Sequence, residues 1–177
     1  SFIRIEIPGE PSPDDIDSAV RMTSDDLIDS VVAIGGGSVM DAGKAISAMA
    51  GMKESVTEFL EGVGTREHPG TRLPFVAVPT TSGTGSEATS NAVITRVGRD
   101  GFKRSLRHAN FVPDIALVDP VLTTSCSPGI TAASGMDCFT QLTEAFLSDR
   151  SNEFTDSLAV EGIKALTDSL AKAYHHG

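Results

Sequence analysis

The 177-residue sequence contains no tryptophan and one tyrosine, and aromatic residues make up only 5% of it. It has no apolar run of signal-peptide length at its start, and no stretch approaches the roughly 20 apolar residues that a membrane helix needs. We therefore expect neither a targeting signal nor a membrane anchor. Basic residues are also scarce, with 14 Lys and Arg against 24 Asp and Glu and a net charge of −10. This balance opposes sequence-independent binding to nucleic acid or anionic membranes, so we expect neither as a partner.

Cysteine is also scarce. Cys126 and Cys138 could form only one disulfide and follow no Cys-x-x-Cys spacing, which favours reduced thiols in a cytoplasmic protein. What the chain does contain is typical of a folded protein, with 40% hydrophobic and 21% charged residues. These values exclude disordered, collagenous and coiled-coil classes. The length allows one domain, or one domain and the beginning of a second.

The apolar patterning predicts alternating strands and helices followed by helices alone. The run at 31–34 is short, continuous and apolar, which is typical of a strand buried on both faces in a parallel sheet. A helix is expected from Pro13, because it follows a capping serine and opens with two acidic residues. The other expected strands are 2–7, 73–78, 91–97, 101–106 and 115–118, with 91–97 and 101–106 forming an antiparallel hairpin. The other expected helices are 38–50, 128–147 and 152–174, and 61–73 is expected to be a surface loop.

This order predicts an α/β fold with a Rossmann-like parallel sheet, joined to an all-helical part. No strand is expected after residue 122, where we place the boundary. The predicted domains are therefore 1–122 and 123–177.

Residues 35–37 are three consecutive glycines that lead from the strand at 31–34 into a helix. Glycines let the backbone approach a ligand, and the N–H groups and dipole at a helix start favour phosphate oxygens. The segment is neither a Walker A loop nor G-x-G-x-x-G, because Ser38 and Met40 stand where these motifs require glycine. An anion site and a tight turn that only packs the helix on the sheet both remain open.

Residues 79–87, Pro-Thr-Thr-Ser-Gly-Thr-Gly-Ser-Glu, form a second junction after a predicted strand. Hydroxyls and backbone amides can bind phosphate and ribose oxygens without side-chain charge. Gly83-x-Gly85-x-x-Ala88 is a weak match to a dinucleotide fingerprint, and a Ser/Thr-rich turn with a helix cap is an equal alternative. Because loops at the carboxyl ends of parallel strands share one crevice, two such junctions favour a nucleotide site.

Four motifs in this order resemble the iron-containing (group III) alcohol dehydrogenase family over nearly the whole chain. They are Gly35-Gly-Gly-Ser38 with Asp41 and Lys44, residues 79–87, Asp119-Pro120, and Gly135-Met-Asp137 with Glu144. The resemblance implies hydride transfer between NAD or NADP and an alcohol or aldehyde. It assigns 1–122 to a dinucleotide-binding domain whose N-terminal part is missing, and 123–177 to the beginning of a helical metal and substrate domain. We therefore expect a fragment that lacks both ends of its parent.

The resemblance also implies which residues bind the cofactor. Asp41 would equally stabilise the first turn of its helix, Lys103 would equally be a solvated hairpin charge, and Leu122 would look the same in a core. The implied cofactor-binding residues are Gly36, Gly37, Ser38, Asp41, Thr80, Thr81, Thr84, Lys103 and Leu122.

The implied metal site departs from the family pattern. Asp137 matches a family ligand, and the family's second ligand is a histidine four residues later, on the same helix face. Here that position is Gln141, whose carbonyl is a poorer ligand for iron or zinc than imidazole. The metal site predicted from Asp137 and Gln141 is thus incomplete, and we assign no catalytic residue. We also assign no role to His68, His108 or the terminal pair His175-His176.

Three alternatives remain open. One is a metal-independent reductase of the same superfamily, similar to maleylacetate reductases, and Gln141 adds weight to it. The second is a nucleotide-binding fragment without chemistry, and the third is a structural fragment that retains only the fold. Surface exposed by missing segments would favour a homo-oligomer.

Overall fold

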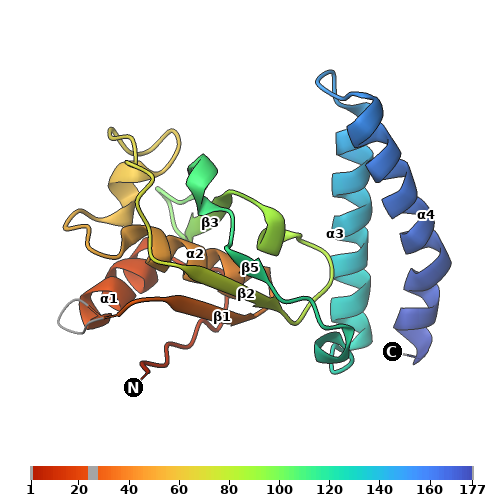
Figure 1. Cartoon of the computed structure of the whole chain (residues 1–177), viewed down its shortest axis with the longest axis horizontal. Helices are drawn as coiled ribbons and strands as arrows, with labels where there is room; N and C mark the ends of the chain where they lie inside the picture. Colours follow the sequence, from red (N-terminus) through yellow and green to blue (C-terminus); the bar gives the residue numbers. More distant parts are fainter. Residues whose placement is uncertain (1, 24–27, 177) are drawn as a thin grey trace. The chain divides into compact units, whose positions relative to one another are not determined.

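The computed structural model describes residues 2–23 and 28–176, and Figure 1 shows its helices and strands. The chain contacts divide it into two compact units. The first unit consists of Ser1–Pro79 and Ser86–Val118, and the second of Thr80–Gly85 and Asp119–Gly177.

The first unit is built on a three-stranded parallel sheet with the order β1-β2-β5. These strands are Val31–Gly35, Phe75–Pro79 and Ile115–Ala116. In the register of β1 and β2, Gly35 is the partner of Pro79. The two strands therefore end side by side, and the chain leaves both at the same edge of the sheet.

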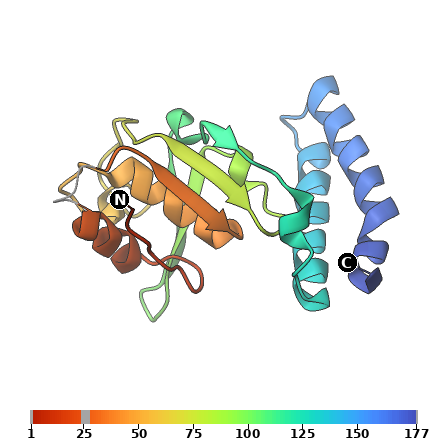
Figure 2. The same cartoon turned by 60° about the horizontal axis from the view of Figure 1, so that its bottom comes forward.

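Helix α2 (Gly37–Met49) packs on one face of β1 and β2 and is buried on nearly all sides (Figure 2). Its Gly43 permits this close approach, since an added Cβ would lie 2.7 Å from Ala33 Cβ and 2.8 Å from the Phe75 ring. Helix α1 (Pro13–Thr23) packs against α2. It begins as predicted, because Ser12 and Asp15 exchange hydrogen bonds between side chain and backbone in a capping box.

The opposite face of the sheet is exposed, which corrects the expectation of a strand at 31–34 buried on both faces. Ala33 is buried, whereas Val32 and Ile34 are 58% and 63% exposed. Successive side chains of a strand alternate between faces, and α2 covers only the face that Ala33 shares.

The strand predicted at 2–7 is also wrong, because this segment has no strand structure. Its Ile5 and Ile7 instead pack against the core as irregular chain. The predicted hairpin is confirmed as β3 (Asn91–Arg96) and β4 (Phe102–Arg107), which pair antiparallel.

The second unit contains two long helices, α3 (Pro128–Leu147) and α4 (Glu153–His176), close to the predicted bounds. They lie side by side and run in opposite directions (Figure 1). Two glycines allow this contact, since an added Cβ would lie 2.3 Å from Leu170 at Gly135 and 2.8 Å from Leu142 at Gly162. Short 3-10 helices are η1 (Val56–Phe59), η2 (Ser86–Ala88), η3 (Ala109–Phe111) and η4 (Pro120–Thr123). None of the described helices is long and apolar enough to cross a membrane.

Candidate cofactor site

The turn from β1 into α2 presents unused backbone donors. Gly36 caps the helix with its backbone alone, and its carbonyl accepts from the amides of Val39 and Met40 at 3.0 Å. The amides of Gly37 and Ser38 donate to no acceptor in the described part of the chain. Free N–H groups at the positive end of a helix are suited to an anion, so this turn has phosphate-binding geometry.

The first glycine of the turn has a different purpose. A Cβ at Gly35 would lie 2.6 Å from Cγ2 of Val39, so a larger residue would push the strand end away from α2. The packing interpretation therefore applies to Gly35, while the anion interpretation concerns the amides that follow it.

The threonine- and glycine-rich loop at 80–85 packs within the second unit. A Cβ at Gly83 would lie 2.5 Å from the carbonyl oxygen of Ser134 in α3, and Gly85 has a φ of +63°. Cys126 Sγ donates to the carbonyl of Thr80 at 3.3 Å. Thr80 is partly exposed and Thr84 is exposed, as is expected of side chains that contact a ligand.

Asp41 and Lys44, one turn apart on α2, meet the segment that begins at Ser86. Lys44 is 1% exposed, although a lysine is almost never buried without partners. Its Nζ donates to the carbonyls of Ser86 and Asn91, both at 2.8 Å, and to the hydroxyls of Ser86 at 3.2 Å and Thr89 at 3.0 Å. Asp41 Oδ1 accepts from the Ser86 hydroxyl at 2.6 Å.

Burial shifts the pKa of both charged groups toward the neutral form. It lowers the pKa of Lys44 to about 8, against the opposing charges of Asp41 and Glu87. It also raises the pKa of Asp41, against the hydrogen bonds from Ser86 and Val93 and the charge of Lys44. At neutral pH most Lys44 side chains remain protonated, so the carbonyls around them face a cation.

Three residues of the predicted cofactor set remain. Thr81 is partly exposed in the loop at 80–85. Lys103 is exposed on β4 and forms an ion pair with Glu10, which also accepts from Thr95. Leu122 is partly exposed in η4, whose first turn is capped by Asp119.

The predicted metal ligands lie together on α3, where Gln141 Nε2 donates to Asp137 Oδ2 at 2.8 Å. They supply two ligating side chains, whereas a protein metal site takes three or four. Among the residues that the structure describes, no group of three or more His, Cys, Asp or Glu could hold an ion. The residues present therefore do not form a metal site by themselves.

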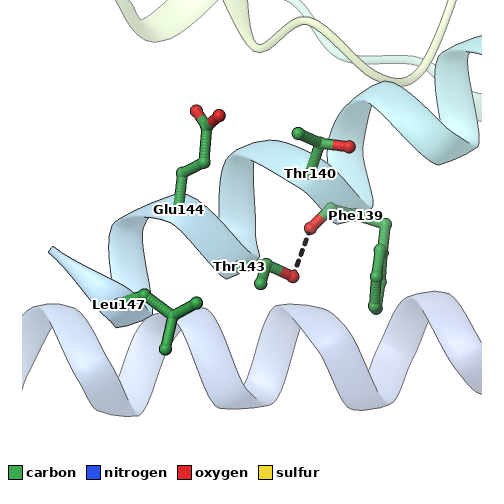
Figure 3. A pocket seen from close by; sticks show the side chains of 5 residues that line it. All are labelled: Phe139, Thr140, Thr143, Glu144 and Leu147. Atoms are coloured by element: carbon green, nitrogen blue, oxygen red, sulfur yellow. Dashed lines mark hydrogen bonds between the residues drawn. The ribbon is translucent and has the colours of Figure 1, made fainter.

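A hollow of about 370 Å³ lies further along α3 (Figure 3). Its lining residues are Phe139, Thr140, Thr143, Glu144 and Leu147. The hydroxyls of Thr140 and Thr143 donate to carbonyls of the preceding helical turn, at 2.9 and 2.8 Å. Both hydroxyls are therefore already hydrogen-bonded within the helix. Glu144 is the one charged residue of the lining, and the hollow is mainly apolar.

Among the buried polar residues, Ser86 and His68 were not predicted from the sequence to lie in the interior. The hydroxyl of Ser86 lies between Asp41 and Lys44. His68 is 8% exposed; its Nδ1 accepts from the Gly70 amide and its Nε2 contacts the Ala48 carbonyl at 3.1 Å. The spacing Asp41-x-x-Lys44 is the sequence feature that indicates the Ser86 contacts, because it places both charges on one helix face.

The parallel sheet with its glycine turn defines a Rossmann-like α/β protein, and comparison with known proteins specifies the family. The profile of iron-containing alcohol dehydrogenases matches residues 2–120, and the profile of the C-terminal region of that family matches residues 131–177. The chain belongs to the iron-containing alcohol dehydrogenase family.

Similar proteins include the probable alcohol dehydrogenase EutG of Salmonella typhimurium, 39% identical over 170 residues, and long-chain-alcohol dehydrogenase 1 of Geobacillus thermodenitrificans, 37% identical over 172. The alignments cover 96% and 97% of this chain but 42% and 43% of those proteins. A crystal structure of sulfoacetaldehyde reductase from Bifidobacterium kashiwanohense in complex with NAD+ matches with a TM-score of 0.91 and 33% identity, over 99% of this chain and 46% of that one. The chain thus spans less than half the length of these relatives.

Proposed function

We propose that this chain supplies the NAD-binding part of an oxidoreductase that transfers a hydride between NAD(P) and an alcohol or aldehyde. The observation that carries the proposal is the pair of unused amides, Gly37 and Ser38, at the start of α2. They follow β1, which ends beside β2. The names of its relatives support this function, including an NAD-dependent methanol dehydrogenase of Bacillus methanolicus that is 34% identical over 168 residues.

In this proposal the α2 turn binds the pyrophosphate. Gly36 caps α2 without a side chain, the amides of Gly37 and Ser38 donate to phosphate oxygens, and the helix dipole adds favourable potential. No basic side chain is needed, which suits a chain of net charge −10. The other proposed cofactor contacts are Thr80, Thr81, Thr84, Lys103 and Leu122.

The nicotinamide supplies the hydride chemistry, and the chain supplies binding and orientation. Asp137 and Gln141 are proposed to face a metal in the complete enzyme, but we derive no step through a metal because the residues described here do not form its site. Cys126 and Cys138 are free thiols, which supports a proposed cytoplasmic location.

Titration with NADH tests the proposal, with Gly37→Asp as the diagnostic variant. An aspartate there places bulk and negative charge where the pyrophosphate is expected, so we predict that the Kd for NADH rises by at least about tenfold. Gly9→Asp is the matched control, because no atom lies within 4 Å of a Cβ at Gly9 and the charge change is the same. Equal affinity of the two variants, or no binding by the wild-type chain, would contradict the proposal.

Binding without chemistry is the alternative that an activity assay must separate from hydride transfer. An assay of NADH oxidation with a panel of aldehydes, with and without added iron, zinc or manganese, separates the two. Turnover supports the oxidoreductase, and NADH binding without any turnover supports binding without chemistry.

A further inference from the structure

We propose that Lys44 is a positioning residue for the cofactor loop. With Asp41 as its counter-charge and Ser86 as the link between them, it fixes residues 86–91, into which the loop at 80–85 continues. The inference rests on the proposed function, because it concerns the same cofactor. It also assigns Asp41 to this internal network in place of direct contact with the cofactor.

The contacts of Lys44 are all internal. Its ammonium carries three N–H donors, and four oxygens of 86–91 lie within 2.8 to 3.2 Å of Nζ. Since the side chain is only 1% exposed, no donor is left for a phosphate. The charge of Lys44 therefore interacts with residues 86–91 and not with the cofactor.

Asp41 is occupied in the same way. Its Oδ1 accepts from the hydroxyl of Ser86 at 2.6 Å, and its Oδ2 accepts from the amide of Val93 at 3.1 Å. The Ser86 hydroxyl donates to Asp41 while accepting from Lys44. The three side chains thus form one continuous series of hydrogen bonds from α2 to η2 and β3.

The segment 86–91 depends on these side chains because its own backbone bonds are few. Before β3 begins at Asn91, it contains the single turn η2, a 3.4 Å bond from the Thr89 amide to the Ser86 carbonyl, and a 3.2 Å bond from the His108 amide to the Ser90 carbonyl. The two carbonyls that Lys44 binds lie at either end of the segment. One buried cation thereby sets the positions of both ends.

The same helix presents the proposed phosphate donors. Gly37 begins α2, and Asp41 and Lys44 follow at intervals of about one turn, so these three residues lie toward one face. α2 therefore connects the pyrophosphate turn to Ser86, the residue that follows the loop at 80–85. Removing these hydrogen bonds should weaken cofactor binding, even though Lys44 does not contact the cofactor.

The test compares Lys44→Met, Ser86→Ala and Asp41→Asn with the control Lys53→Met, which alters an exposed lysine. NADH binding is followed by the emission of NADH, free of tryptophan background because the chain has none. We expect the Kd to rise about tenfold in each of the three network variants and to stay within about twofold in the control. The double variant Lys44→Met/Ser86→Ala should bind about as weakly as the weaker single variant, because both changes break one network.

Hydrogen exchange supplies a readout that is independent of the cofactor. It is measured at a temperature at which circular dichroism shows every variant to be folded. The network variants should exchange faster at 86–93 while β1 and β2 keep their protection. If Lys44→Met does not fold, Ser86→Ala carries both measurements, because it removes one hydroxyl and leaves both charges.

The outcomes are distinct. Weaker binding in Asp41→Asn alone would overturn the inference and make Asp41 a direct cofactor contact. Unchanged NADH affinity in Lys44→Met and Ser86→Ala, or faster exchange spread evenly over the chain, would overturn it as well. Failure of the wild-type chain to bind NADH would contradict the proposed function, and hydrogen exchange would then decide by itself whether Lys44 fixes 86–91.

Discussion

At the scale of single residues, the buried polar side chains of the described residues, Lys44, Ser47, His68 and Ser86, each have a hydrogen-bond partner. Lys44 shows why the sequence could not predict this. A lysine in an amphipathic helix is usually solvent-exposed, and the oxygens that hold Lys44 come from residues 42 to 47 positions later. The motif that contains Lys44 was recognised, but its burial depends on packing between distant segments.

His68 makes stability depend on pH. Burial lowers its pKa, the carbonyl of Ala48 opposes this, and the charge of His108 adds to it. Because the folded-state pKa lies below the ordinary value, the unfolded chain binds more protons, and the contribution of His68 is lost as pH falls below about 6.5. Protonation would also turn Nδ1 into a donor that faces the Gly70 amide.

We therefore predict that the free energy of unfolding of the wild-type chain falls as pH drops from about 6.5. His68→Gln should remove this component, whereas His175→Gln, at an exposed helix end, should keep it. Urea denaturation at a series of pH values measures the effect. The same pH dependence in His68→Gln and wild type would refute the assignment.

Gly43 provides a test of packing. Its replacement by alanine adds a Cβ 2.7 Å from Ala33 Cβ, so α2 must move away from the sheet. We predict a loss of about 1–3 kcal/mol in the free energy of unfolding. Gly9→Ala is the control and should change it by less than about 0.5 kcal/mol. Equal denaturation midpoints for the two variants would show that α2 and β1 are not tightly packed.

At the scale of elements, sequence patterns predicted most helices and strands. They were insufficient where the pairing or the burial of a strand depends on a neighbouring element. The alternating residues at 2–7 fit a strand, but no strand pairs with them. The run at 31–34 does form β1, yet Val32 and Ile34 are exposed because α2 covers one face only. The spacing of apolar residues indicates which side chains favour burial, but it does not indicate which other element packs over them.

The ion pair of Arg72 and Asp114 joins the start of β2 to the chain that leads into β5. Arg72 binds both carboxylate oxygens, at 2.6 and 2.9 Å, and the Phe75 amide donates to one of them at 2.7 Å. The side-chain hydrogen bonds from Arg72 hold the pKa of Asp114 well below its ordinary value. The contribution of this carboxylate is therefore present above its ordinary pKa and lost as the pH falls below it.

Asp114→Asn should lower the free energy of unfolding by about 1 kcal/mol at neutral pH, a modest loss because Asp114 is nearly half exposed. The control is Asp100→Asn in the exposed hairpin turn, where we expect no measurable change. Thermal denaturation at pH 7 compares the two. A similar result for both variants would mean that the ion pair does not hold β5 in place.

At the scale of the whole molecule, the chain divides into two structural units. The sequence predicted a boundary at residue 122, and the assignment of 1–122 and 123–177 to cofactor and helical domains stays a prediction. The structure adds that the loop at 80–85 packs within the helical unit, through Gly83 against Ser134. Such a contact joins residues 51 positions apart, and nothing in the local sequence of the loop specifies it.

The central claim is that the amides of Gly37 and Ser38 bind the pyrophosphate of NAD. Nuclear magnetic resonance of the ¹⁵N-labelled chain during titration with NAD+ tests it most directly. We predict that the amide resonances of Gly37 and Ser38 shift most. Their shifts should saturate with the same Kd that displacement of NADH gives. NAD+ binding that leaves these two resonances unchanged while others move, or no binding at all, would contradict the account.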